Sequence, residues 1–160
     1  MQINQKKILA VDDDLFILEL ISEITASKWE LGTCYSGAEA LMRIPAYLPD
    51  LILLDIVMPG LNGFEVCQQI RSNKRWSNIK IIFVSGRNQT KDIEKAYALG
   101  ADGYIIKPFG PDELLQYIDS HLMGEFKEEF PVLESCQSVS RCLLSNKQVK
   151  TGTEYPIFTV

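Results

Sequence analysis

Long basic runs and long hydrophobic stretches are both missing from this sequence. It has 16 Lys and Arg against 21 Asp and Glu, which gives a net charge of -5. Without a basic patch there is no electrostatic footprint for a phosphate backbone, so direct nucleic-acid binding is disfavoured. The polar residues 1–7 lead straight into a short apolar run, without the longer segment that a signal peptide or membrane span requires. We therefore expect a cytoplasmic chain with no membrane partner.

Metal-binding side chains of the zinc type are also scarce. The four cysteines, Cys34, Cys67, Cys136 and Cys142, contain no CxxC pair, and His121 is the only imidazole. A zinc site has little to be built from in such a sequence. We expect reduced and mostly buried thiols instead.

The length of 160 residues suits one ordinary domain with an appendage. Hydrophobic residues make up 46% and charged residues 23%, as in a folded globular protein. We predict one domain over residues 1–124 and a C-terminal extension over 125–160, where Pro131 and a Ser- and Thr-rich stretch change the pattern. That stretch is too short for a winged-helix output domain. It leaves three alternatives open: an extension, a partner-binding arm, or the opening of an output region that continues elsewhere.

Short apolar runs alternate with helical patterns up to residue 123. Strands are predicted at 8–11, 30–35, 51–54, 79–84 and 104–106, and helices at 15–24, 36–44, 64–73, 90–99 and 111–123. Pro45 should end the second helix, Gly100 suits a left-handed residue after the fourth, and Ser36 with Glu39 has capping-box spacing. Helical crossovers imply parallel strands, so the predicted fold class is α/β: a doubly wound five-stranded parallel sheet with helices on both faces.

Polar side chains follow four of the predicted strands. Asp12 and Asp13 follow the first, Asp55 the third, Ser85 the fourth and Lys107 the fifth. The carboxyl ends of parallel strands lie at one edge of the sheet, so these residues should gather there. Clustered carboxylates repel one another and need a cation, and Mg²⁺ is the natural choice because it prefers hard oxygen ligands.

This cluster predicts phosphoryl chemistry. With the metal bound, Asp55 can act as a nucleophile toward a phosphoryl donor, Lys107 can neutralise charge on the transferred oxygens, and Ser85 can donate a hydrogen bond to them. Each residue alone is weak support, because strand-end acids usually cap helices and a lone lysine or serine usually lies at the surface. Their joint placement carries the prediction. Asp14, a third acid, is expected to cap the first helix.

Four sequence motifs carry a resemblance to a known family. They are ILAVDDD at 8–14, LILLDIVMPGLNGFEV at 51–66, IIFVSG at 81–86 and GADGYIIKPF at 100–109. In this order and spacing they resemble response-regulator receiver domains of two-component systems, similar to the single-domain chemotaxis and sporulation regulators. The resemblance runs from about Lys6 to Met123 and implies a CheY-like sheet with strand order 2-1-3-4-5.

The resemblance also implies a role for each matching residue. Asp55 matches the phosphoacceptor, and Asp13 matches the direct metal ligand. Asp12 matches the acid that holds the ion through water, and the Val57 backbone carbonyl matches a third metal contact. Magnesium is the implied cofactor, and Mn²⁺ can substitute for it.

A second group of matching residues is implied to sense the phosphoryl group. Ser85 and Lys107 match the sensing pair, and the peptide bond before Pro108 is expected to be cis, which directs Lys107 into the pocket. Tyr104 matches an aromatic residue that turns inward when the chain is activated, although an ordinary core tyrosine is an open alternative.

The implied function is signalling, with no enzymatic activity beyond self-phosphorylation and slow auto-dephosphorylation. A sensor histidine kinase or phosphotransfer protein is the expected donor. Phosphorylation should shift the surface of the fourth helix, fifth strand and fifth helix toward a downstream effector protein or domain, or toward a dimer.

Three positions depart from the family pattern, and two other functions compete with it. Gly86 replaces the usual Ala and should loosen its loop, while Val57 and Arg87 influence the hydrolytic water and point to a longer phosphoryl lifetime.

A phosphatase with an aspartate nucleophile would need an acid where Val57 lies. A flavodoxin-like FMN binder would need a phosphate loop after the first strand, where three acids occur instead.

Overall fold

The computed structural model describes residues 5–123, so the predicted extension over 125–160, with Cys136 and Cys142, lies outside the described residues. Five strands form one sheet in the order β2-β1-β3-β4-β5, and all neighbours are parallel. The strands are β1 (Lys7–Val11), β2 (Glu30–Cys34), β3 (Leu51–Leu54), β4 (Lys80–Ser85) and β5 (Gly103–Ile106). This arrangement confirms the predicted doubly wound α/β class.

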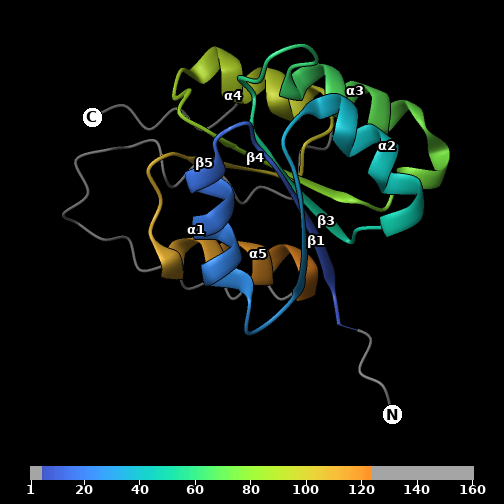
Figure 1. Cartoon of the computed structure of the whole chain (residues 1–160). Coiled ribbons are helices and arrows are strands. Elements are labelled where there is room, and N and C mark those ends of the chain that lie inside the picture. Colours follow the sequence, from blue (N-terminus) through green and yellow to red (C-terminus); the bar gives the residue numbers. More distant parts are fainter. Residues whose placement is uncertain (1–4, 124–160) are drawn as a thin grey trace.

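Helices cover both faces of the sheet, with α1 and α5 on one side and α2, α3 and α4 on the other (Figure 1). Their bounds are α1 (Leu15–Thr25), α2 (Gly37–Tyr47), α3 (Gly63–Ser72), α4 (Thr90–Ala98) and α5 (Pro111–Met123). A short 3₁₀ helix, η1 (Lys74–Trp76), lies between α3 and β4. The sequence analysis did not predict η1.

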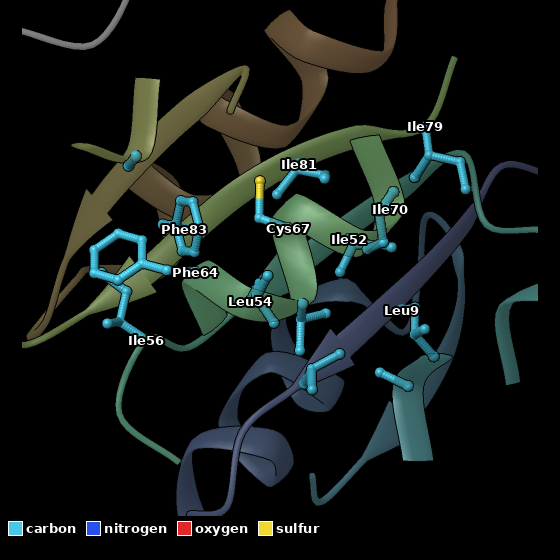
Figure 2. Packing of buried hydrophobic residues seen from close by; sticks show 14 of the residues in the cluster. Leu9, Ile52, Leu54, Ile56, Phe64, Cys67, Ile70, Ile79, Ile81 and Phe83 are labelled. Carbon is cyan, nitrogen blue, oxygen red and sulfur yellow. The ribbon is translucent and has the colours of Figure 1, made fainter. Parts of the chain in front are cut away.

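Alternate residues of each strand point to opposite faces of the sheet, and this divides the core in two. Leu9, Ile52 and Leu54 pack beneath α2 and α3 in one cluster, together with Phe64 and Phe83 (Figure 2). The neighbouring residues Ile8, Ala10 and Leu53 pack against α1 and α5 in the other cluster. Burying one such aliphatic side chain stabilises a fold by about 1.5–3 kcal/mol, so a continuous apolar run is stable only in a doubly covered strand.

The second helix does not end at Pro45 as predicted, and Pro45 lies inside it. The helix continues to Tyr47 and ends at Leu48, which has a left-handed φ of 53° and donates its N–H to the Ile44 carbonyl. Proline lacks one helical donor and disfavours the preceding turn, but packing can override that cost. Here the Tyr47 hydroxyl donates toward the carbonyls of Ile8 (3.3 Å) and Glu30 (3.2 Å), which fastens the last turn to the sheet.

The predicted capping box at the start of α2 forms only in part. The Ser36 hydroxyl accepts the Glu39 N–H at 3.2 Å, but the Glu39 carboxylate accepts the N–H of Tyr35 rather than that of Ser36. A complete capping box occurs at α3 instead, between Asn62 and Glu65. Each such bond satisfies a donor that the first helical turn leaves without a partner.

Cys34 and Cys67 are both buried and unpaired. Burial raises the pKa of the Cys67 thiol to about 11, and burial also raises the pKa of Cys34. Both are therefore protonated core side chains, as the sequence predicted for these two.

Candidate functional site

An open cleft of about 380 Å³ lies at the carboxyl edge of the sheet. Every side chain that the sequence analysis placed at this edge lines it, and Arg87 and Gly86 of the β4–α4 loop do so too. The lining residues are Asp12, Asp13, Asp14, Asp55, Val57, Ser85, Gly86, Arg87 and Lys107. The topology therefore gathers loops that are far apart in the sequence around one space.

Three carboxylates lie together in this cleft. Asp12 and Asp55 are buried, Asp13 is exposed, and one oxygen of each lies within 4.8 Å of the others. Carboxylates this close repel one another unless a cation lies between them. An all-oxygen donor set with one solvent-facing member suits a hard divalent ion that keeps part of its water shell.

The backbone holds Asp12 and Asp55 side by side. The Asp55 N–H donates to the Val11 carbonyl at 2.9 Å, directly beside the point where β1 passes into Asp12. Gly63 begins α3 so close to this strand end that a Cβ there would lie 2.1 Å from the Asp55 carbonyl oxygen. Only glycine permits that approach. The sequence analysis did not single out Gly63 and missed this positioning role.

Lys107 is the counter-charge inside the cleft. Its ammonium lies 2.6 Å from Asp12 Oδ2 and 3.5 Å from Asp55 Oδ1. The Lys107–Pro108 peptide bond is cis, and the Lys107 N–H donates to the Ser85 carbonyl at 2.9 Å. One ammonium thus faces two buried carboxylates, and negative charge remains in excess.

Burial, and after it the neighbouring charges, set the pKa of Asp55. Burial raises the pKa of this carboxyl from 3.8 to about 6; the Lys107 ammonium opposes the rise and the Asp12 carboxylate adds to it. Asp55 is therefore mostly ionised at neutral pH, although its negative charge is poorly stabilised. A carboxylate in this condition favours any cation that enters the cleft.

Ser85 and Tyr104 meet through the backbone of Arg87. The buried Ser85 hydroxyl accepts the Arg87 N–H at 3.3 Å, and the Tyr104 hydroxyl donates to the Arg87 carbonyl at 2.8 Å. The Tyr104 side chain is fully buried, and burial raises its pKa to about 12. Its hydroxyl therefore stays a donor at neutral pH.

Asp14 and Val57 complete the account of the predicted residues. The Asp14 carboxylate accepts the Phe16 N–H at 2.9 Å and caps α1, while the Asp14 N–H donates to Asp12 Oδ1 at 2.9 Å. The Val57 side chain is 55% exposed and lies in the cleft wall, at the position where a phosphatase of the weighed type would need an acid.

The comparisons with known proteins decide the family. The model of the response regulator receiver domain matches residues 8–119, which is more than half of the chain. The chain belongs to the response-regulator receiver family. Its architecture and acidic cleft are therefore those of a signalling receiver domain.

Two curated relatives place this receiver domain in context. A probable transcriptional regulator, ycf27 of Cyanophora paradoxa, is 39% identical over 123 residues, which is 76% of this chain and 50% of the relative. The DNA-binding response regulator MtrA of Mycobacterium tuberculosis is 32% identical over 155 residues, which is 96% of this chain and 66% of MtrA. The chain thus spans about half to two thirds of the length of these relatives.

Solved structures agree with the family. A CheY-like receiver domain protein of Methanospirillum hungatei has a TM-score of 0.71 and 31% identity, covering 79% of this chain and all of that one. CheY in a CheX–CheY–BeF3–Mg complex from Borrelia burgdorferi has a TM-score of 0.67 and 25% identity, covering 72% of this chain and 87% of that one. Within residues 5–123 no helix is long and apolar enough to cross a membrane.

Proposed function

We propose that Asp55 of this receiver domain accepts a phosphoryl group, with Asp12 and Asp13 holding Mg²⁺ beside it. The observation that carries the proposal is the three-carboxylate cluster with oxygens within 4.8 Å of one another, together with the Lys107 ammonium at 2.6 Å and 3.5 Å from two of them. Seven of the described residues that line the cleft are charged or polar, and four of them are acids. This arrangement leaves negative charge in excess in a partly buried site, which costs stability and therefore indicates a function.

The transfer step follows from the chemistry of a carboxylate. An Asp55 oxygen attacks the phosphorus of an acyl phosphate or phosphohistidine, a new P–O bond forms, and the bond to the leaving group breaks with its electron pair. When bound, Mg²⁺ supplies charge neutralisation for the phosphoryl oxygens, and Mn²⁺ is expected to substitute for it. The proposed ligands are the carboxylates of Asp12, Asp13 and Asp55 and the backbone carbonyl of Val57.

Lys107 and Ser85 are the proposed contacts of the new phosphoryl group. Lys107 is already held in the cleft by Asp12, so its ammonium needs little reorganisation to pair with a phosphoryl oxygen. The Ser85 hydroxyl accepts a bond from Arg87, and a hydroxyl that accepts one bond can also donate one. Tyr104 is buried inward beside this loop, which supports the proposed switch role without excluding an ordinary core role.

The proposed output is a change in the surface formed by α4, β5 and α5. A sensor histidine kinase or phosphotransfer protein is the proposed phosphoryl donor. The proposed target of the switch is a downstream effector, or a second copy of the chain, bound through α4, β5 and α5. Residues 125–160 lie outside the described part, so their link to an output region stays a prediction, as does a cytoplasmic location.

The test is phosphorylation by a small donor. Incubation with acetyl phosphate and Mg²⁺, followed by intact-mass measurement, should add one phosphoryl group to the wild type and none to Asp55→Asn. Asp50→Asn is the matched control, because Asp50 lies at the opposite edge of the sheet and pairs with Lys6 at 2.8 Å. An adduct that persists in Asp55→Asn would overturn the proposal, and so would sustained turnover of an added phosphomonoester.

A further inference from the structure

Arg87 connects the cleft to α4, and neither the family match nor the sequence predicted this connection. Its backbone N–H and carbonyl bond to Ser85 and Tyr104, and its side chain lines the cleft that contains Asp55. The guanidinium itself bonds to Asp92 Oδ1 at 3.3 Å, away from the three clustered carboxylates. Arg87 thus contacts Ser85, Tyr104 and the fourth helix.

Asp92 is an unusual partner because it is mostly buried. Its side chain is 11% exposed, whereas that of Arg87 is 49% exposed. It lies in the first turn of α4, and its N–H bonds to the carbonyl of Gln89, the N-cap residue, whose side chain makes no capping bond. A carboxylate in the first turn is favoured by the helix dipole, but a buried one still loses stability when its cation leaves.

We propose that Arg87 exchanges partners on phosphorylation, leaving Asp92 and pairing with the phosphoryl group on Asp55. This inference rests on the proposed function of Asp55. Arg87 then contacts the phosphoryl group directly and couples the cleft to α4, and Asp92 is the competing partner that sets how readily Arg87 moves.

The energies of the two pairings favour such an exchange. The Arg87–Asp92 pair is half exposed on one side and long at 3.3 Å, so it belongs to the weak class of ion pairs. A phosphoryl group carries more charge than a carboxylate and offers oxygens for a bidentate guanidinium contact. The release of Asp92 leaves a mostly buried carboxylate without this cation, so the first turn of α4 must adjust.

A double-mutant cycle tests the exchange, with beryllofluoride and Mg²⁺ as the probe for the phosphoryl group. Asp92→Asn removes the competitor and should tighten beryllofluoride binding about threefold, which is the range of one weak ion pair with a solvent-exposed cation. Arg87→Gln removes the contact and should weaken binding about ten- to hundredfold, the range of one charged hydrogen bond. The double variant should bind like Arg87→Gln alone, because Asp92 acts only through Arg87.

Charge-matched controls separate this effect from net charge. Arg75→Gln and Glu94→Gln change exposed residues of η1 and α4 that do not line the cleft, and they should leave the affinity unchanged. Hydrogen exchange supplies a structural readout: beryllofluoride should speed exchange at the Asp92 and Ile93 amides in the wild type but not in Arg87→Gln. Circular dichroism verifies that each variant is folded.

The outcomes distinguish this inference from the proposed function. If acetyl phosphate labels Asp55 while Arg87→Gln and Asp92→Asn bind beryllofluoride like the wild type, the exchange is wrong and the phosphoacceptor role stands. Equal and independent effects of the two substitutions would also overturn the exchange. If the wild type is not labelled at Asp55, the proposed function fails first and takes this inference with it.

Discussion

Aspartate carboxylates at the two edges of the sheet differ in how many partners they have. At the amino edge, Asp102 before β5 accepts bonds from Arg71 Nη2 (2.9 Å), Lys80 Nζ (3.1 Å) and the Ile81 N–H (3.0 Å). At the carboxyl edge, Asp12 and Asp55 share the ammonium of Lys107. Donors outnumber carboxylates at the first edge, and carboxylates outnumber cations at the second.

This difference separates a stabilising site from a functional one. Asp102 ties α3, β4 and β5 together, because Arg71 also donates to the carbonyls of Gly100 (2.7 Å) and Ile79 (3.0 Å). At the carboxyl edge, the Asp55 carboxylate gains less from its partners than it loses by burial, as its raised pKa indicates. The same residue type therefore stabilises the fold at one edge and leaves a demand for a cation at the other.

The largest expected effect comes from removing the Asp102 carboxylate at the amino edge. Asp102→Ala removes the acceptor of two cations and one backbone N–H, so we expect the free energy of unfolding to fall by about 2–4 kcal/mol. Urea denaturation followed by circular dichroism measures this loss. Glu23→Ala, an exposed helical acid, is the control and should change stability by less than about 0.5 kcal/mol. A small loss in Asp102→Ala would mean that this network does not hold the fold.

The second expected effect has the opposite sign and lies at the carboxyl edge. The pKa of Asp55 is about 6 in the folded chain against an ordinary value of 3.8. A raised pKa gives stability that is complete below pH 3.8 and is lost as pH rises through 6. Asp55→Asn lacks this loss, so in metal-free buffer at pH 7.5 it should be more stable than the wild type by about 3 kcal/mol.

Denaturation midpoints at several pH values test that sign. The advantage of Asp55→Asn should shrink toward zero as pH falls from 7.5 to 4, and Mg²⁺ should reduce it by stabilising the wild type. At ten times its dissociation constant, a bound ion adds about 1.4 kcal/mol to the folded state. A wild type that is more stable than Asp55→Asn in metal-free buffer would contradict the view that Asp55 is poorly compensated.

Much of the fold could be predicted from the sequence, because most of its strands are apolar runs too short for helices, although β2 (ELGTC) gives a weaker pattern. Leu51 to Leu54 is buried at all four positions, as a doubly covered strand requires. The predicted helix end at Pro45 was wrong, since proline predicts a break while the contacts of Tyr47 with the sheet keep the helix intact. Local propensity carries no information about such distant contacts.

The candidate site was predicted as a set of residues but not as a set of pairs. Topology alone brings Asp12, Asp55 and Lys107 to one edge, and the structure adds that Lys107 lies nearer to Asp12. The pairing of Arg87 with Asp92 was missed because Asp92 reads as an ordinary first-turn acid. The bond from Arg71 to Asp102 spans 31 positions, so no local pattern could have suggested it.

The smallest expected effect concerns the β4–α4 loop at the carboxyl edge. Gly86 follows Ser85 at the carboxyl edge, where a Cβ would meet nothing within 4 Å and φ lies outside the left-handed region. Gly86→Ala should therefore stabilise the fold by about 0.4–1 kcal/mol, because alanine restricts the unfolded chain. Gly60 is the matched control: its surroundings are equally open, but its φ of +76° should make Gly60→Ala destabilising. Urea denaturation of both variants decides the matter. If Gly86→Ala lowers stability, the β4–α4 loop needs glycine for its conformation; if it raises stability, this loop, like the acids beside it, is not optimised for stability.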